Sequence, residues 1–414
     1  MRIIADFHIH SKYSRATSKV MDIPNLARWA KLKGIDIMGT GDFTHPLWLH
    51  ELKQALKPSS TAEGLYEYDG VHFILTAEVC NIFSSGGKAR RVHNALFAPS
   101  FEVVDKINKE FGYIGNLAAD GRPMFGLSAE ELVKIALSAS PDCLIVPGHV
   151  WTPWFGVLGA NSGFDSVEEC FGKEAKNIYC LETGLSSDPA MNWRLSKLDK
   201  YSLISNSDSH SPQKIGREAN VFDCKMSYKE IINILKTKDK KKFLYTVEFF
   251  PQEGKYHWAG HRACGVSMSP LEAKNNNYTC PRCGKGITIG VESRVEKLAD
   301  RPEGFTPDNA IPFKSMIPLI EIIAEARGKT STSVGVIDEH MKTIKRLKSE
   351  FNILFDMQDA ELEKELAGPV ADAVKRVRNG QVHIAPGYDG VYGEVKIFGK
   401  DEKPPEKEKQ MELF

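Results

Sequence analysis

Neither charge is in excess in this sequence of 414 residues, because lysine plus arginine and aspartate plus glutamate both number 54. Net charge therefore gives no indication of nucleic-acid binding, and any basic contact surface must be local. A run of about 18 apolar residues is also lacking, which argues against a membrane-spanning helix. Residues 1–10 lack the long apolar core of a secretory signal. We therefore expect a cytoplasmic protein with no membrane partner.

Cysteine is scarce and unevenly placed. Three of the eight cysteines, Cys264, Cys280 and Cys283, cluster, whereas the other five are scattered. This distribution favours buried free thiols in a reducing compartment over a disulfide framework. The chain length predicts two or three domains, at about 100–200 residues each.

Apolar patterning predicts an α/β domain over residues 1–250. Short β-branched or apolar runs alternate there with longer amphipathic segments, which is typical of a largely parallel sheet. The predicted strands cover 2–10, 35–43, 72–79, 91–98, 142–150, 177–184 and 201–210. Helices are predicted over 24–34 and 128–140, and the second opens with a serine cap followed three residues later by glutamate.

Side chains that can bind metal stand at the ends of nearly all these strands. They are His8, His10, Asp42, His45, Glu78, His93, His149, Glu182, Asp208 and His210. In a parallel α/β barrel the carboxyl ends of the strands converge on one face, so these residues would meet. His8 and His10 are two positions apart on a strand and therefore point to the same face. A mixed set of nitrogen and oxygen ligands suits zinc, manganese or iron.

Each of these residues has a structural alternative. A single strand-end histidine could be a satisfied core or surface residue, His93 could be a buried polar residue, and Glu182 could accept backbone hydrogen bonds. Coincidence at seven successive strand ends is nevertheless a poor explanation of the whole set. The set therefore predicts a metal cluster, and the membership of Glu182 stays open.

Five segments resemble the metal-binding motifs of the polymerase and histidinol phosphatase (PHP) superfamily: 6–14, 39–45, 76–79, 147–150 and 207–210. The resemblance implies a PHP-type distorted (β/α)7 barrel with two or three divalent ions (Zn, Mn, Mg or Fe) that catalyse phosphoester hydrolysis. It places His8, His10, Glu78 and Asp208 on one ion, Glu78, His93 and His149 on a second, and His210 on a third. The 39–45 segment departs from the common Thr-Asp-His pattern, so either Asp42 or His45 could complete the third site. The implied catalytic residues are His8, Glu78 and Asp208.

A second metal site is predicted in residues 251–300. His261 and Cys264 are followed after fifteen residues by Cys280 and Cys283, which is the spacing of a closed tetrahedral zinc site. His257 is an alternative to His261. We expect one structural zinc ion that folds a segment too small for a core of its own.

Residues 301–398 are predicted to form a mostly helical, DNA-binding region. The apolar-faced segment 314–328 is a predicted helix, and 385–398 is a predicted hairpin. Basic runs lie at 236–243, 342–348 and 374–381. Such runs are often solvated faces, but several of them near a phosphodiester site would also suit a nucleic-acid backbone.

The order of these modules, with the segments 149–156, 161–172, 181–196 and 386–393, resembles the endonuclease Q family of DNA repair nucleases from residue 1 to about 398. The resemblance implies cleavage 5′ to deaminated bases (uracil, hypoxanthine, xanthine) and abasic sites. The damaged base would be flipped into a pocket. Two alternatives stay open: a small-molecule phosphoesterase of the histidinol phosphatase kind, and a DNA-binding subunit with a decayed site.

Substrate-binding candidates follow the predicted metal ligands. Trp151, Trp154 and Phe155 could stack on bases, although each could also be a core residue. Asn161 and Ser162 lie in the glycine-rich segment 156–163 and could bind a base edge, and Glu182 is a further candidate. Asn116 and Asp120, in segment 112–123, lie on the same predicted face or are simple turn residues.

Residues 399–414 are charged and contain proline, which predicts a disordered tail. Its end, with Gln410, Met411, Leu413 and Phe414, resembles the bacterial pentapeptide that binds the DNA sliding clamp. Methionine replaces the usual leucine at the second position. The resemblance implies a clamp partner and a bacterial source.

Overall fold

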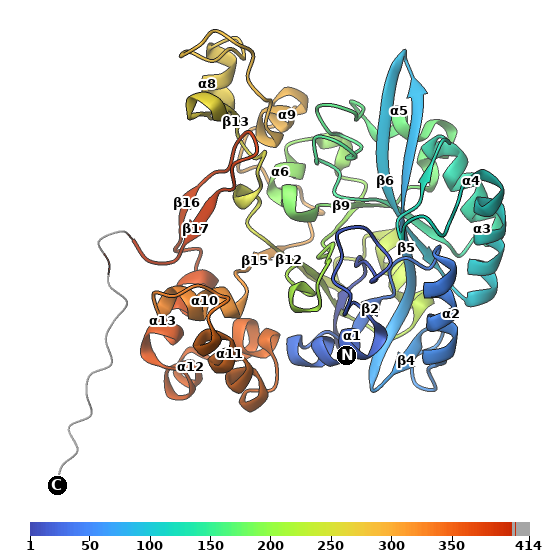
Figure 1. Cartoon of the computed structure of the whole chain (residues 1–414), viewed down its shortest axis with the longest axis horizontal. Helices are drawn as coiled ribbons and strands as arrows, with labels where there is room; N and C mark the ends of the chain where they lie inside the picture. Colours follow the sequence, from blue (N-terminus) through green and yellow to red (C-terminus); the bar gives the residue numbers. More distant parts are fainter. Residues whose placement is uncertain (400–401, 403–414) are drawn as a thin grey trace.

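The computed structural model describes residues 1–399 and residue 402. The predicted clamp-binding residues Gln410, Met411, Leu413 and Phe414 lie outside the described residues. Figure 1 shows a barrel formed by the first part of the chain, a small module above it and a separate group of helices beside it. Within residues 1–399 no helix combines the length and the apolar character needed to cross a bilayer.

Seven of the described strands form the barrel. They are β1 (Arg2–Asp6), β2 (Ile37–Gly39), β5 (Val71–Ser85), β6 (Lys88–Ala98), β8 (Leu144–Pro147), β9 (Cys180–Glu182) and β10 (Ser202–Ile204). Ladders join β1 to β2, β2 to β5, β5 to β6, β6 to β8 and β9 to β10. No ladder spans the other two gaps among the described residues, which backbone hydrogen bonds such as Val150 N to Glu182 O and His10 N to Ser209 O, both 3.0 Å, help to close. The barrel is therefore distorted, as the PHP resemblance implied.

The sheet predicted as largely parallel is instead a mixed one. The strand pairs β1–β2, β2–β5 and β9–β10 are parallel, but β5–β6 and β6–β8 are antiparallel. The segments predicted as 72–79 and 91–98 are parts of one long hairpin that turns at Gly86 and Gly87. Both glycines have positive φ angles, 59° and 71°, which a tight turn between twisted strands requires. The Gly86-Gly87 dipeptide is the sequence feature that could have predicted this hairpin.

Further strands extend the sheet beyond the barrel. They are β11 (Ala219–Asp223), β12 (Phe243–Glu248) and β15 (Phe313–Ser315) on the β1 side, and β4 (Tyr66–Tyr68), β3 (Lys57–Pro58) and β7 (Met124–Phe125) on the β5 side. β15 pairs with β12 in parallel, so the sheet continues into the C-terminal part of the chain.

Helices cover the outside of the barrel. They are α1 (Ile23–Lys33), α2 (Pro46–Ala55), α3 (Phe101–Ile114), α4 (Ala129–Ala139), α5 (Val167–Phe171), α6 (Pro189–Trp193) and α7 (Tyr228–Thr237). The predicted helices at 24–34 and 128–140 are confirmed as α1 and α4. The Ser128 side chain accepts from the Glu131 N–H while Glu131 binds back to Ser128, which satisfies two free donors at the start of α4. Leu132, Val133 and Ala136 of α4 are fully buried.

The small module contains β13 (Ala259–His261), β14 (Val266–Met268), α8 (Pro270–Asn275) and α9 (Val291–Leu298). Its own core has six buried residues: Ala259, Val266, Met268, Ala273, Cys280 and Ile287. Arg294 of α9 fixes the module to the barrel, since its guanidinium donates to the carbonyl oxygens of Leu158 at 3.0 Å and Phe164 at 2.9 Å.

The C-terminal helices are α10 (Leu319–Ala326), α11 (Val334–Arg346), a π-helical turn (Asn352–Asp356), α12 (Asp359–Glu365) and α13 (Gly368–Arg378). The helix predicted over 314–328 is shorter than expected, because 313–315 pairs as β15 and Pro318 caps α10. The predicted hairpin forms as β16 (His383–Ala385) and β17 (Glu394–Lys396). Its loop holds the small module through Gly387 O, which accepts from Trp258 N at 2.9 Å.

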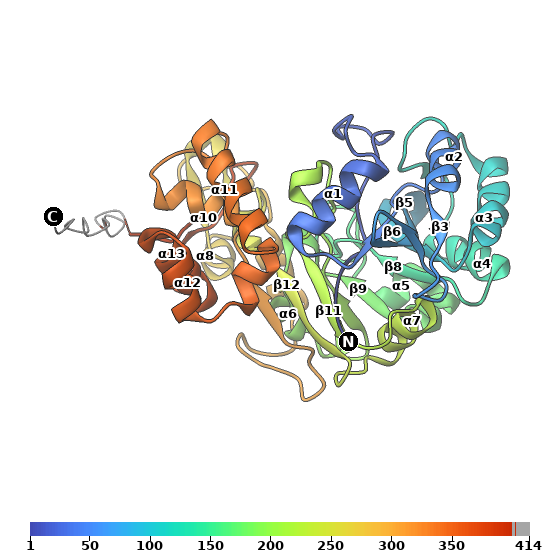
Figure 2. The same ribbon diagram turned by 90° about the horizontal axis from the view of Figure 1, so that it is seen from below.

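A buried ion pair joins these helices to the barrel. Lys33 at the end of α1 lies 2.8 Å from Glu350, and both side chains are almost completely buried. His340 of α11 approaches the same Glu350 oxygen at 3.3 Å. Figure 2 shows α1 on the side of the barrel that faces the helices. The two parts are thus held by charge as well as by apolar packing.

Candidate metal centre

The first group of predicted ligands comes together at the carboxyl ends of the barrel strands. His10 Nε2 lies 3.0 Å from Asp208 Oδ1 and 3.3 Å from Glu78 Oε2. His8 Nε2 lies 3.7 Å from the same Glu78 oxygen and 3.8 Å from Asp208 Oδ1. One atom from each of the four residues falls within 4.8 Å of the others, which is the spacing of ligands around one ion.

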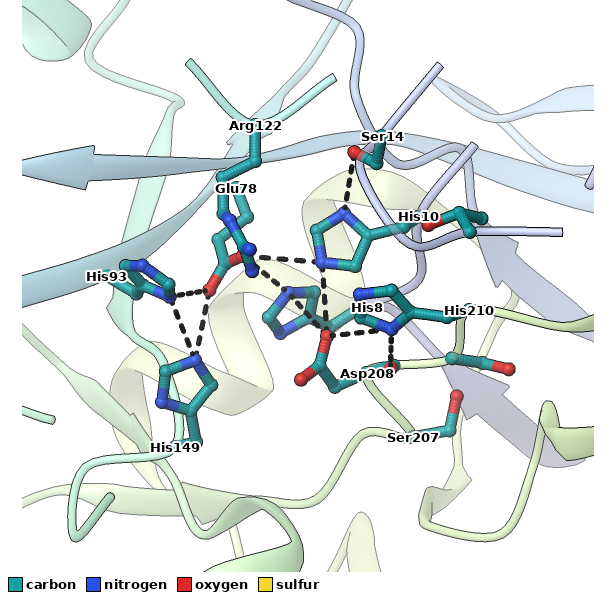
Figure 3. Close-up of polar contacts among 12 residues, drawn as sticks. His8, His10, Ser14, Glu78, His93, Arg122, His149, Ser207, Asp208 and His210 are labelled. Carbon is teal, nitrogen blue, oxygen red and sulfur yellow. Dashed lines mark hydrogen bonds and ion pairs between the residues drawn. The ribbon is translucent and has the colours of Figure 1, made fainter. Parts of the chain in front are cut away.

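Glu78 also belongs to a second group. Its other oxygen, Oε1, lies 2.8 Å from His93 Nδ1 and 3.1 Å from His149 Nε2. Figure 3 shows the Glu78 carboxylate between the two sets of imidazoles. A carboxylate with one oxygen toward each group can bridge two divalent ions.

The donor atoms fit metal ions because they lack other partners. His8 Nε2, His10 Nε2 and Asp208 Oδ1 are buried and have no hydrogen-bond partner in the described part of the chain outside the ligand group itself. Buried polar atoms without partners are costly, so such a cluster needs a ligand. The mixed nitrogen and oxygen donors suit zinc, manganese or iron better than magnesium, which prefers oxygen and water.

Glu182 and Asp42 lie behind the two histidines of β1. The Nδ1 atom of His8 is 2.9 Å from Glu182 Oε1, and that of His10 is 3.0 Å from Asp42 Oδ1. Carboxylates in this position fix the tautomer and orientation of a ligating imidazole. Glu182 is fully buried and also accepts from His149 N and Asn206 Nδ2, both at 2.9 Å. Its predicted contact with substrate does not fit this position.

A third ligand group is not assembled among the described residues. Asp42 is occupied by His10 and by the Ser11 N–H and hydroxyl, at 2.6 and 2.7 Å. His45 stacks on Tyr13, with 4.4 Å between ring centroids. His210 donates from Nδ1 to Asp208 O at 2.8 Å and keeps about a third of its side chain exposed. The third site implied by the PHP resemblance therefore lacks a converging set of donors in this structure.

Backbone strain is concentrated at this centre. Asp42, His149 and Asp208 have positive φ angles of 48°, 28° and 45°. Residues other than glycine rarely adopt such angles, and they persist where surrounding contacts over-determine them. The strain places these side chains where regular strands would not.

Charges within the cluster shift the pKa values strongly. Although burial lowers the pKa of His8, the carboxylates of Glu182 and Glu78 raise it well above the ordinary value. The pKa of Asp208 is lowered far below its ordinary value, because the hydrogen bond and charge of His10 and the charge of His8 outweigh burial. Burial instead lowers the pKa of His93 to about 4. Binding of an ion must therefore displace protons from His8 in a site whose carboxylates are already ionised.

Arg122 is a functional residue that sequence reasoning missed. Its Nη1 donates to Glu78 Oε2 at 2.9 Å, and over a quarter of its side chain is exposed. The Glu78 carboxylate raises its pKa. Arg122 lies in segment 112–123, which contains the predicted substrate-binding residues Asn116 and Asp120. No sequence motif identifies Arg122 itself.

Asn116 and Asp120 act within their loop in this structure. The Asn116 side chain accepts from Ala118 N at 3.0 Å. Asp120 accepts from Arg122 N at 3.1 Å and from Arg15 N at 3.2 Å. Asp120 therefore positions the backbone that carries Arg122.

The predicted base-binding residues separate into buried and accessible ones. Trp151 is fully buried and donates to Asn192 at 2.8 Å, so it is a core residue and the stacking prediction does not fit it. Ser162 is buried, with its hydroxyl between Phe155 N at 3.1 Å and Arg91 O at 3.4 Å. It has no free side toward a base.

Trp154, Phe155 and Asn161 remain accessible. Trp154 is half-buried, and its ring lies edge-on to Tyr256 of the small module at 5.1 Å. The ring of Phe155 lies 4.5 Å from that of His93. Asn161 is exposed. Phe155 adjoins the second ligand group through His93, and Trp154 and Asn161 are accessible residues of the same segment.

The small module brings together its four predicted ligands. His261, Cys264, Cys280 and Cys283 each place one donor atom within 4.8 Å of the others, and His261 Nδ1 lies 3.4 Å from Cys283 Sγ. The backbone N–H groups of Arg282 and Cys283 help to lower the pKa of Cys280 to about 6, despite burial. His257 is buried 3.7 Å from Glu292, outside this group. The donor set fits one tetrahedral zinc ion.

Solved structures supply a whole-chain relative. The lesion-specific endonuclease PfuEndoQ from Pyrococcus furiosus is 33% identical to this chain, with a TM-score of 0.85 and coverage of 96% of both chains. The chain belongs to the endonuclease Q family. A structure of an endonuclease Q with a 27-mer duplex substrate that has an abasic lesion at its active site gives a TM-score of 0.83, again at 33% identity and 96% coverage of both chains.

Other relatives are described less specifically. The uncharacterized protein YqxK of Bacillus subtilis is 26% identical over 95% of this chain and 99% of its own length. The uncharacterized protein MJ0043 of Methanocaldococcus jannaschii is 31% identical over 60% of this chain, and the match spans only 31% of that longer protein. Residues 318–381 match the family described as the MJ0043 C-terminal domain.

Membership of the endonuclease Q family confirms two predictions from the sequence. The family assignment is correct, and so is the α/β fold with a cysteine and histidine module and C-terminal helices. Endonuclease Q is a metal-dependent nuclease family, which agrees with the two ligand groups around Glu78.

Proposed function

We propose that this chain is a DNA repair endonuclease that hydrolyses the phosphodiester 5′ to deaminated bases (uracil, hypoxanthine, xanthine) and abasic sites. The observation that carries the proposal is the Glu78 carboxylate, which faces two groups of converging donor atoms in a chain similar to a lesion-specific endonuclease throughout its length. The related complex with an abasic duplex supports the same class of substrate.

Two divalent ions held by these groups would place positive charge on the phosphate oxygens and lower the pKa of a water molecule. Glu182 and Asp42 hold the rear N–H groups of His8 and His10, so the Nε2 atoms face the reaction centre. Arg122 uses one N–H on Glu78 and has further donors for a phosphate oxygen. Arg122 therefore binds and orients the phosphate that is cleaved.

The damaged base would leave the stack at a cost of roughly a few kcal/mol, which is smaller for a mispaired base. We place it beside Trp154, Phe155 and Asn161, because these residues are accessible and Phe155 adjoins His93. The zinc module and the C-terminal helices would bind the flanking duplex.

The sliding clamp is the proposed partner of residues 410–414. The free cysteines support a reducing, cytoplasmic location.

The test uses end-labelled duplexes with one uracil, one hypoxanthine, one abasic site or no lesion, with added Mg²⁺, Mn²⁺ or Zn²⁺ and a chelator control. We expect a metal-dependent nick directly 5′ of each lesion and an intact undamaged duplex. Release of phosphate from small phosphomonoesters, without a nick in any duplex, would instead identify a small-molecule phosphoesterase.

A further inference from the structure

The long hairpin of β5 and β6 continues past the metal centre as a two-stranded arm, residues 82–91. Ile82 pairs with Arg91, and Ser85 pairs with Lys88 next to the glycine turn. Glu78 lies seven residues from Ser85 on the same strand, so the arm projects roughly 24 Å beyond Glu78 at about 3.4 Å per residue. Figure 1 shows this hairpin rising above the barrel beside the other strands.

One face of the arm continues the face that carries the metal ligands. Glu78 pairs with Ala95, Cys80 with His93, and Ile82 with Arg91, so these side chains share one side of the hairpin. Arg91 lies two residues from His93, or roughly 7 Å along the strand. That distance corresponds to about two base-pair steps of a DNA strand, at about 3.4 Å per phosphate along the helix axis. A DNA strand that runs from the metal centre along this face would therefore bring a neighbouring phosphate within reach of Arg91.

The base of the arm is held rigidly. Arg90, on the opposite face, places its guanidinium 4.2 Å from the ring centroid of Phe164 and donates to Gly163 O. The backbone of Arg91 makes two hydrogen bonds to Ser162. Arg91 N donates to Ser162 O at 3.4 Å, and Arg91 O accepts from the Ser162 hydroxyl at 3.4 Å. Arg91 is thus presented from a fixed backbone, with its own side chain exposed.

Among the described residues the cations of the arm are unpaired, whereas half of those in the basic runs pair with carboxylates. Arg91, on the face of the metal ligands, and Lys88, on the opposite face beside the turn, are exposed and make no ion pair within residues 1–399. In contrast, many cations of the basic runs contact carboxylates at 2.5 to 3.3 Å: Lys242 with Glu230, Lys342 with Asp338, Lys375 with Glu363, Arg376 with Asp372 and Arg378 with Asp359. A cation already paired gains less from a phosphate than a free one.

We propose that the β5–β6 arm contacts DNA, with Arg91 on the face of the metal ligands and Lys88 beside the turn at its tip binding backbone phosphates of the duplex next to the cleaved bond. This inference rests on the proposed function and names the part of the chain that holds one flank of the substrate. Phosphate contacts position a duplex without reading its bases. The arm therefore contributes to affinity for every DNA duplex equally and leaves the choice of lesion to the site.

The experiment compares Lys88→Ala/Arg91→Ala with the wild-type chain and with Lys134→Ala, an exposed lysine of α4 that is paired with Glu130. Binding of a fluorescent undamaged duplex is measured by anisotropy across a salt series. We expect the slope of log affinity against log salt to fall by about 2 in the double variant, with about eightfold weaker binding at 0.1 M salt for each lost contact. Lys134→Ala should match the wild type.

Cleavage of a uracil duplex gives the second readout. The KM for DNA should rise in the double variant while kcat at saturating DNA and the ranking of lesions stay unchanged. An unchanged salt slope, or a loss of kcat with unchanged affinity, would overturn the role of the arm. Absence of lesion cleavage by the wild type would overturn the proposed function instead, and the binding data would still decide whether the arm contacts DNA. Thermal unfolding checks that both variants are folded.

Discussion

The most informative substitution in the metal centre is Glu182→Gln. Glu182 accepts hydrogen bonds from His8 Nδ1, His149 N and Asn206 Nδ2, all at 2.9 Å. Glutamine keeps the shape, but its amide nitrogen cannot accept, so at least one of these buried donors loses its partner. An unmade buried hydrogen bond costs about 1–3 kcal/mol. Because the affected donors orient His8 and His149, much of that cost should appear as weaker metal binding.

The expected result is a 10- to 100-fold increase in the Mn²⁺ concentration that gives half-maximal cleavage of a uracil duplex, which is the range for residues that orient metal ligands. The rate at saturating Mn²⁺ and the KM for DNA should change little. Glu361→Gln, at an exposed position of α12, is the matched control. If Glu182→Gln raised the KM for DNA and left the Mn²⁺ dependence unchanged, Glu182 would contact substrate and the orienting role would be refuted.

Three further substitutions test other parts of the chain. Asp208→Asn should abolish cleavage in the duplex assay, because one anionic donor of the first ligand group is lost. DNA affinity and thermal unfolding should stay close to wild type. Glu350→Gln leaves Lys33 buried without its partner and should lower the free energy of unfolding by about 3–5 kcal/mol in urea titrations. The charge of Lys33 lowers the pKa of Glu350 to about 2 against burial, so this stabilisation is complete above the ordinary pKa of 4.5 and is lost as the pH falls toward 2. Cys280→Ser should lower the zinc content by one ion per chain and make the 251–300 module sensitive to protease, with the barrel unaffected.

The two ligand groups show which site residues could be predicted from the sequence. His8 and His10 share a face because strand residues alternate, and the predicted strand ends bring Glu78, His149 and Asp208 toward one face of a barrel. In the structure Glu78 and His93 lie within the long strands β5 and β6 instead. The structure brings these six residues into two groups, as the PHP resemblance implied. The spacing of His261, Cys264, Cys280 and Cys283 was equally informative, because four ligands around one ion need short loops of defined length.

Residues that act behind or beside the ligands could not be assigned in this way. Glu182 and Asp42 are carboxylates, as are the ligands Glu78 and Asp208, so residue type does not tell them apart. Only the packing around His8 and His10 places them on the Nδ1 atoms of these histidines. Trp151 follows His149 in the sequence, yet the turn at that strained residue directs its side chain into the core. Arg122 reaches Glu78 across 44 positions of sequence, which no local pattern records.

The sequence by itself determined the chemistry of the centre, the zinc module and the family, because these depend on residue types at short, fixed spacings. The tertiary structure alone decided that β5 and β6 form one antiparallel arm, which carboxylates bind ions and which hold histidines, and which cations are free to meet DNA. Each of these depends on contacts between distant segments. Their energies arise from burial and charge pairing that exist only after the chain has folded.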